Sequence, residues 1–184
     1  MDDQVSERLT IRNFRAEDAD DLFAYLHQPS ARCFLSSALA DRSAAVVEAQ
    51  RRAANDDYLA VSLRADGRVI GDVFGIAEQI DREGEADTFS VGWNFNPAFG
   101  GNGYALESAR TLFSHLFTAR HARRLYAYVD EGNTASERLC QRLGMRKEGL
   151  FRELVSFVND GNNSPIFENT IQYSLLSKEW ASWH

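Results

Sequence analysis

The chain of 184 residues is 44% hydrophobic and 26% charged, which is typical of one globular domain with a buried core. Its formal net charge of -7 argues against a nucleic-acid partner, because phosphate binding requires clustered lysine and arginine side chains. Its apolar stretches are too short to span a membrane and its first residues lack a signal-peptide pattern, so we expect a cytoplasmic protein without membrane contact.

The first half of the chain is predicted to form a strand, two helices and a hairpin. Leu9 and Ile11 alternate with polar residues, as in a half-buried strand, and the next segment repeats apolar residues at helical spacing. A second helix follows, and then two strand-like stretches are joined by Ala65-Asp66-Gly67, a typical hairpin turn. The expected ranges are 9–12 for the first strand, 16–26 and 39–54 for the helices, and 58–63 and 69–76 for the hairpin.

The second half is predicted to continue with strand, helix, strand, helix and a last hairpin. After an acidic loop at 81–87, a strand is expected to end at Asn96-Pro97, because proline cannot donate a backbone hydrogen bond. Gly144 is expected to close the last helix in the left-handed conformation. The expected ranges are 88–95, 125–129, 152–158 and 166–175 for the strands, with helices from about 104 and over 133–143.

This order of elements predicts a single α/β (α+β) domain. Runs of strands that alternate with amphipathic helices are typical of a mixed sheet with helices packed on its faces. We therefore expect a largely antiparallel central sheet of about seven strands, covered by helices on both faces.

A glycine-rich turn, Gly100-Gly101-Asn102-Gly103, stands between a predicted strand and the long helix. The first turn of a helix has unpaired N–H groups and a partial positive charge, so phosphate oxygens can bind there without lysine or arginine. A Walker loop would need Lys followed by Ser or Thr after its last glycine, and Tyr104-Ala105 stands there instead. A Rossmann fingerprint would need a third glycine, which is also missing. On its own, the turn is explained equally well as a tight strand-to-helix connection.

Two segments resemble motifs of the GNAT acetyltransferase family. Residues 91–107, V-G-W-N-F-N-P-A-F-G-G-N-G-Y-A-L-E, resemble its acetyl-CoA motif Q/R-x-x-G-x-G/A, with Gly100 in place of Gln or Arg. Residues 133–145, N-T-A-S-E-R-L-C-Q-R-L-G-M, resemble its N-x-x-S helix, which ends in L-G-F. The loss of the long side chain at Gly100 would remove a secondary phosphate contact and leave the backbone cradle in place.

The resemblance extends over most of the chain. The segments at 7–12 and 148–153 are similar to the RimJ/RimL branch, which contains ribosomal-protein N-terminal acetyltransferases. A GNAT domain is therefore expected over residues 7–180, with residues 1–6 and 181–184 as terminal extensions.

The resemblance implies acetyl-CoA as the acyl donor. The strand that ends at Phe95 would splay from the strand at 125–129 and receive the pantetheine arm, and the backbone amides of Asn94 and Phe95 would hold the thioester carbonyl. Asn133 would bind the pantetheine arm in addition to capping its own helix. The expected cofactor-binding residues are Asn94, Phe95, Gly100, Gly101, Asn102, Gly103, Tyr104, Ala105, Asn133 and Ser136.

Ser136 and Glu153 are the expected catalytic residues. Ser136 would protonate the departing thiolate, although a solvated serine on a helix surface explains it equally well. A carboxylate would take the surplus proton of the amine, and Glu153, Asp87 and Asp72 are candidates because their segments should border the acceptor cleft. The simpler interpretation of Glu153 is an ion pair with Arg152 on the strand surface.

The expected reaction is direct transfer of an acetyl group to a primary amine, with a protein or peptide N-terminal α-amine as the favoured acceptor. A small amine such as an antibiotic is the alternative, and a non-catalytic acyl-CoA sensor or partner module is an alternative of another class. No metal is expected, because the four histidines and two cysteines lack metal-site spacing. We expect a monomer or homodimer that binds neither nucleic acid nor a membrane.

Overall fold

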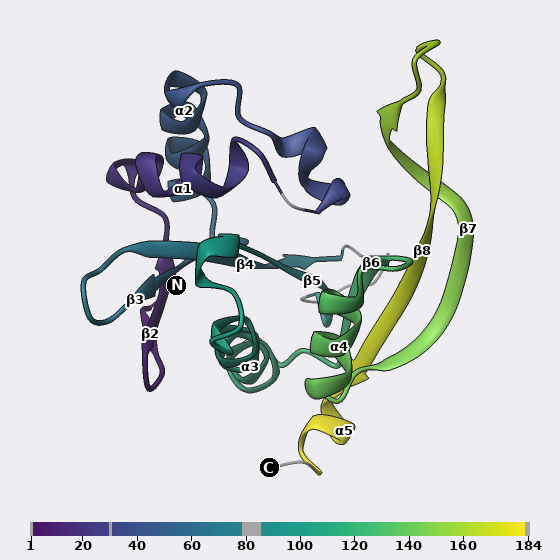
Figure 1. Ribbon diagram of the computed structural model, residues 1–184. Coiled ribbons are helices and arrows are strands. Elements are labelled where there is room, and N and C mark those ends of the chain that lie inside the picture. The colour runs from purple at the N-terminus through teal and green to yellow at the C-terminus, as the bar shows by residue number, and fades with distance from the viewer. Residues whose placement is uncertain (1, 30, 79–85, 183–184) are drawn as a thin grey trace.

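The computed structural model describes residues 2–29, 31–78 and 86–182 and shows one sheet with helices on both faces (Figure 1). The strands lie in the order β1-β2-β3-β4-β5-β6-β8-β7, with β5 and β6 parallel and the other pairs antiparallel. They are β1 Gln4–Val5, β2 Leu9–Asn13, β3 Tyr58–Leu63, β4 Val69–Ala77, β5 Thr88–Phe95, β6 Arg124–Asp130, β7 Arg146–Asn159 and β8 Pro165–Leu176. The predicted fold class is confirmed, and the additional strand β1 is too short to show a periodic pattern in the sequence.

Two main helices cover each face of the sheet (Figure 1). Helices α1 Ala19–Leu26 and α2 Arg42–Ala53 lie on one face, and α3 Tyr104–Thr118 and α4 Thr134–Arg142 lie on the other. Short helical turns complete the described elements: η1 Ala16–Asp18, η2 Arg32–Ser37, η3 Pro97–Phe99 and α5 Ser177–Trp180. The helix predicted from residue 39 begins later, because the Asp41 side chain accepts a hydrogen bond from the Ala44 backbone N–H at 2.8 Å and so fixes the N-cap.

The alternation of side chains along the strands divides the core into two layers. On the α3 and α4 face, Leu59 and Val61 of β3 are buried in one cluster with Phe113 of α3. On the α1 and α2 face, Ala60 is buried in a second cluster with Leu22 of α1. Each fully buried large apolar side chain contributes roughly 1.5–3 kcal/mol, so both helical layers are held mainly by hydrophobic burial.

A buried polar cluster also lies beneath α1 and α2. The Arg52 guanidinium forms an ion pair with Asp72 of β4 at 3.0 Å, and their side chains are 5% and 2% exposed. The Tyr25 hydroxyl donates to the same carboxylate at 2.8 Å. This cluster ties both helices to the centre of the sheet, and breaking a pair so deeply buried is costly.

The strands β5 and β6 diverge after a short parallel ladder. They are paired through Thr88↔Arg124, Phe89↔Leu125 and Ser90↔Tyr126. Beyond that point, β5 continues beside β4 as far as Phe95, and β6 continues beside β8 as far as Asp130. A gap therefore opens between the ends of these two strands, as the resemblance implied.

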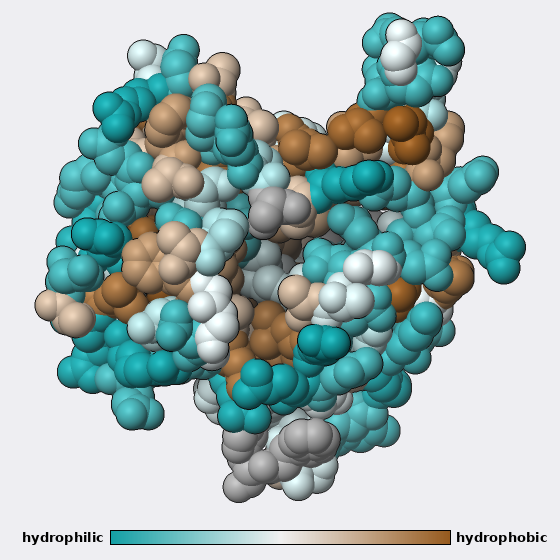
Figure 2. All heavy atoms as spheres, viewed as in Figure 1, coloured by the Kyte–Doolittle hydropathy of each residue, from teal (hydrophilic) through white to brown (hydrophobic). Residues whose placement is uncertain are grey.

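The last two strands form a long arm that projects from the body of the protein (Figure 1). β7 is longer than predicted, and its pairing with β8 shifts register at three places. Glu153 has a φ of 50°, the left-handed region that non-glycine residues rarely adopt, and lies at one of these shifts. Figure 2 shows hydrophobic residues gathered on the arm below its polar tip, where Leu154, Ile166 and Phe167 are exposed.

Candidate functional site

A cavity of about 600 Å³ occupies the gap between β5 and β6. At one end it is lined by the glycine-rich turn and the start of α3, and at the other by η2 and β7. Several predicted cofactor-binding residues line it together, namely Asn94, Phe95, Gly100, Gly101, Gly103, Tyr104, Ala105, Asn133 and Ser136. Segments that are far apart in the sequence therefore meet in one cavity.

The glycine-rich turn presents its backbone to the cavity. Gly101 and Gly103 have φ values of 79° and 80°, so both require the left-handed conformation that glycine tolerates best. Gly103 is the N-cap of α3 and has no side chain with which to cap the first N–H groups of that helix. These N–H groups are consequently available to an anion, and the turn fits a phosphate-bearing ligand.

Asn102 was predicted as a cofactor ligand but is not among the residues that line the cavity. Its side-chain amide donates to the carbonyl oxygens of Phe99 and Gly100, both at 3.1 Å. The Arg8 guanidinium donates to the Asn102 carbonyl at 3.0 Å and forms an ion pair with Glu107. These contacts stabilise the conformation of the glycine-rich turn, and the Asn102 and Arg8 side chains that make them are not among the residues that line the cavity.

Two arginines that the sequence reasoning missed also line the cavity, Arg138 and Arg142 of α4. Both side chains are exposed and lie four residues apart, so they share one face of the helix. That spacing was the available signal, although a solvated helix surface has the same pattern. The arginines add positive charge to the same cavity that the glycine-rich turn lines.

Ser136 faces β5 across the cavity. Its hydroxyl accepts a hydrogen bond from the indole N–H of Trp93 at 3.3 Å and keeps its own proton free to donate. The side-chain oxygen of Asn133 accepts from the Ser136 backbone N–H at 3.2 Å, which confirms Asn133 as the N-cap of α4. Asn133 and Ser136 thus hold a fixed relative position at the wall of the cavity.

Asn94 brings an unsatisfied polar group to the same cavity. Its side chain is buried, and its amide nitrogen has no hydrogen-bond partner among the described residues. A buried donor without a partner costs roughly 1–3 kcal/mol, so a ligand that accepts a hydrogen bond would be stabilised here. Asn94 pairs across the ladder with Asp72, which places its side chain on the α1 and α2 face.

The far end of the cavity contains a carboxylate that the sequence reasoning also missed. Asp130, the last residue of β6, lines the cavity and is half-buried. Burial raises the pKa of this carboxyl, and the interaction with Cys33 of η2 lowers it. Burial likewise raises the pKa of the Cys33 thiol to about 12, so the thiol is protonated at neutral pH. Aromatic side chains of Phe34, Tyr128 and Phe157 line this end as well.

The carboxylates predicted as proton acceptors lie elsewhere. Asp72 belongs to the buried cluster under α1 and α2, so it does not border the acceptor end of the cavity as predicted. Asp87 forms an ion pair with Arg123 at 2.9 Å, and residues 81–85 of the predicted acidic loop lie outside the described residues. Glu153 is exposed on β7 and is not among the lining residues, although its role in catalysis stays a prediction.

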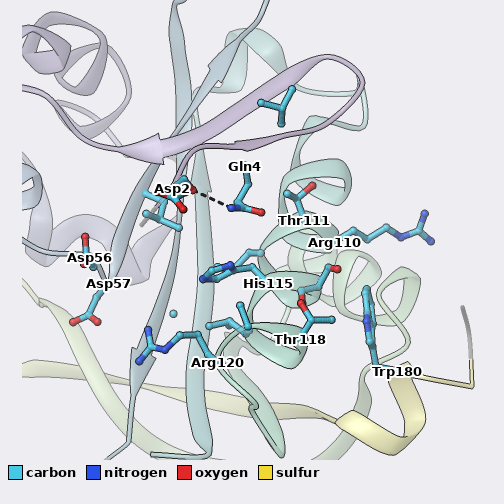
Figure 3. Close-up of a pocket in the computed structure, with 17 residues that line it drawn as sticks. Asp2, Gln4, Asp56, Asp57, Arg110, Thr111, His115, Thr118, Arg120 and Trp180 are labelled. Atoms are coloured by element: carbon cyan, nitrogen blue, oxygen red, sulfur yellow. Dashed lines mark hydrogen bonds between the residues drawn. The ribbon is translucent and has the colours of Figure 1, made fainter.

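A second cavity, of about 1020 Å³, lies between the first strand and α3 (Figure 3). Figure 3 shows Asp2 and Gln4 on one side of it and His115 of α3 below them, whereas the Arg110 side chain extends away from these residues. None of the residues predicted to bind the cofactor lines it. Across residues 2–29, 31–78 and 86–182, no cluster of three or more potential metal ligands is present, and no helix is long and apolar enough to cross a membrane.

Comparison with known proteins identifies the family. A family model described as an acetyltransferase (GNAT) domain matches residues 8–146. The uncharacterized N-acetyltransferase YnaD of Bacillus subtilis strain 168 is 24% identical over 182 residues, which cover 96% of this chain and 98% of that protein. A GNAT-family acetyltransferase structure from Bacillus anthracis has a TM-score of 0.81 at 23% identity and covers 96% of this chain and 99% of its own.

The structure of RimL, a ribosomal L7/L12 α-N-protein acetyltransferase in complex with coenzyme A, is also similar. It has a TM-score of 0.73 at 14% identity, and the match covers 94% of this chain and 96% of the RimL chain. The glycine-rich turn, the splayed strands and the matched model agree, and the chain therefore belongs to the GNAT acetyltransferase family and transfers an acetyl group from acetyl-CoA.

Proposed function

We propose that this enzyme acetylates the N-terminal α-amine of a protein or peptide. The observation that carries the proposal is that one cavity is lined both by the glycine-rich turn and by residues of η2 and β7. The part lined by η2 and β7 lies beside the β7 and β8 arm, whose exposed apolar side chains extend the surface beyond the cavity (Figure 2). An extended peptide could contact both, and the similarity to RimL supports the same class of acceptor.

The proposed chemistry uses the side chains of the cavity wall. Acetyl-CoA supplies the acetyl group as a thioester when it is bound. We propose that the N–H groups at the start of α3, with Arg138 and Arg142, bind its phosphates, and that Asn94 and Phe95 provide donors near the thioester. Ser136 then protonates the sulfur that leaves.

The function is tested by acetylation of a defined set of amines, with the product identified by mass spectrometry. The set contains peptides with a free α-amine, the same peptides with a blocked N-terminus and one lysine, and small primary amines. The proposal expects acetylation at the α-amine of the free peptides. Acetylation of small amines in preference to peptides would identify the alternative acceptor, and CoA binding without any product would contradict amine acetylation.

We expect Ser136→Ala to lower kcat by about a hundredfold or more, while the Kd for CoA changes by less than about threefold. A proton donor acts chiefly as the thiolate leaves, so its loss lowers kcat more than it weakens CoA binding. The measurements are steady-state kinetics with a saturating peptide acceptor and calorimetry with CoA. Equal losses in both would indicate a binding role, and an unchanged kcat would leave Ser136 a surface residue.

A further inference from the structure

The end of β6 carries a carboxylate at the level where β5 is expected to hold the thioester. The register of the parallel ladder, from Thr88↔Arg124 to Ser90↔Tyr126, places Asn94 level with Asp130 when it is continued along both strands. The ladder is not continued, so the cavity separates these two residues. A group bound at Asn94 would therefore face Asp130 across the gap.

Asp130 approaches this gap from the side opposite Ser136. Leu125 and Val129 of β6 are buried in the core with α3 and α4, so by strand alternation Asp130 points to the other face. Its contact with Cys33, which belongs to the segment between α1 and α2, agrees with this direction. Ser136 projects from α4. A proton donor and a proton acceptor on opposite sides suit a reaction in which an amine enters as a thiolate leaves.

The charged groups around Asp130 leave it able to accept a proton. The thiol and the backbone amide of Cys33 interact with its carboxylate, and Arg32 of the same segment is a nearby cation. Glu168 of β8 is a second carboxylate close by, and its ion pair with Arg32 at 2.8 Å offsets much of its charge. Burial raises the pKa of Asp130, Glu168 raises it further, and Cys33 and Arg32 lower it.

We propose that Asp130 is the proton acceptor for the attacking amine and that Cys33 is a positioning residue for its carboxylate. This inference rests on the proposed function of amine acetylation. The amine nitrogen bonds to the acyl carbon, the carbon–sulfur bond breaks, one proton passes from nitrogen to Asp130, and the leaving thiolate takes the proton of Ser136. Both side chains then restore their protonation by exchange with water.

The catalytic part is tested with Asp130→Asn, which removes the charge and keeps the shape. We expect kcat for the peptide acceptor to fall about a hundredfold, the typical contribution of a general base, with the Kd for CoA unchanged. Glu131→Gln is the matched control, because Glu131 is exposed, bonds to Asn169 at 2.8 Å and is not among the lining residues. Its kcat should match that of the parent enzyme.

A kcat within threefold of the parent in Asp130→Asn would overturn the role of Asp130. If Glu153→Gln lost turnover at the same time, the proton acceptor would be Glu153. These results are distinct from failure of the proposed function, in which the parent enzyme itself acetylates small amines in place of the peptides, or no amine in the set.

The positioning role of Cys33 is tested by the pKa of Asp130, measured by NMR titration of its carboxyl carbon in the folded protein. A donor that favours the charged carboxylate lowers its pKa, so Cys33→Ala should raise the pKa and Cys33→Ser should restore it. The acidic limb of the kcat profile should move in the same direction. An Asp130 pKa that is unchanged in Cys33→Ala would contradict the positioning role, whatever the activity.

Discussion

Gly103→Val is expected to weaken CoA binding about a hundredfold. Gly103 has a φ of 80° at the N-cap of α3, a conformation that a β-branched residue resists. A Cβ there would lie 3.6 Å from the Arg8 guanidinium, which is ordinary contact, so the obstacle is the backbone conformation rather than space. The turn would have to change its conformation, and the backbone N–H groups at the start of α3 would then lose their hydrogen bonds to the phosphate. Two such charge-assisted hydrogen bonds are together worth about 3 kcal/mol or more, which corresponds to about a hundredfold in Kd.

The matched control for this prediction is Gly67→Val. Gly67 has a φ of 77° in the hairpin turn between β3 and β4 and has open space around its Cβ position, so the substitution introduces similar strain away from the cavity. Both variants should lose stability of roughly 1–3 kcal/mol, but only Gly103→Val should lose CoA affinity in calorimetry. A folded Gly103→Val protein that binds CoA within threefold of the parent would contradict the backbone cradle.

Arg52→Leu is expected to lower the free energy of unfolding by about 3–5 kcal/mol, because it leaves Asp72 buried without its cation. Arg51→Leu is the control from the neighbouring position. Arg51 and Arg52 both form ion pairs with Glu48 at 2.7 Å, but the Arg51 side chain is 52% exposed. Its loss should cost no more than about 1 kcal/mol. Urea unfolding measures the free energy of unfolding of both variants. Similar losses in the two variants would show that the buried Arg52–Asp72 pair does not account for the destabilisation.

The Arg52→Leu variant should also depend on pH in a defined direction. Burial raises the pKa of the Asp72 carboxyl, and Arg52 opposes this rise in the parent protein. Without Arg52 the folded-state pKa rises further above the unfolded value of about 3.9, so the folded state binds more protons than the unfolded state over that interval. The variant is therefore expected to lose stability as the pH rises above about 4.

The parts of the site that lie within one short segment could be predicted from the sequence. The contacts between segments that are distant in the chain could not. The glycine-rich turn and the Asn133 cap depend on residues close together in the chain, and their conformations follow from backbone and capping preferences. Asp130 and Cys33 meet because β6 ends beside the segment that joins α1 to α2, and no pattern within either segment encodes that contact.

The same limit explains why Asp72 was predicted to lie in the wrong place. The sequence places it correctly on a strand, but its partners Arg52 and Tyr25 come from α2 and α1, and the side of β4 that meets them depends on register. In the structure a register shift between Val61 and Ser62 alters the pairing of β3 with β4. A shift of one residue exchanges the two faces of a strand, so the partner of Asp72 could not be deduced from alternation alone.

The two edge strands of the sheet affect whether two molecules can pair through their sheet edges at high concentration. One edge of the sheet is β1, which is two residues long, and the other is β7, which shifts register repeatedly and bends at Glu153. A straight row of free backbone N–H and C=O groups is what allows one sheet to extend into another, and neither edge presents such a row. The backbone geometry of the described edges therefore disfavours edge-to-edge pairing of one sheet with another.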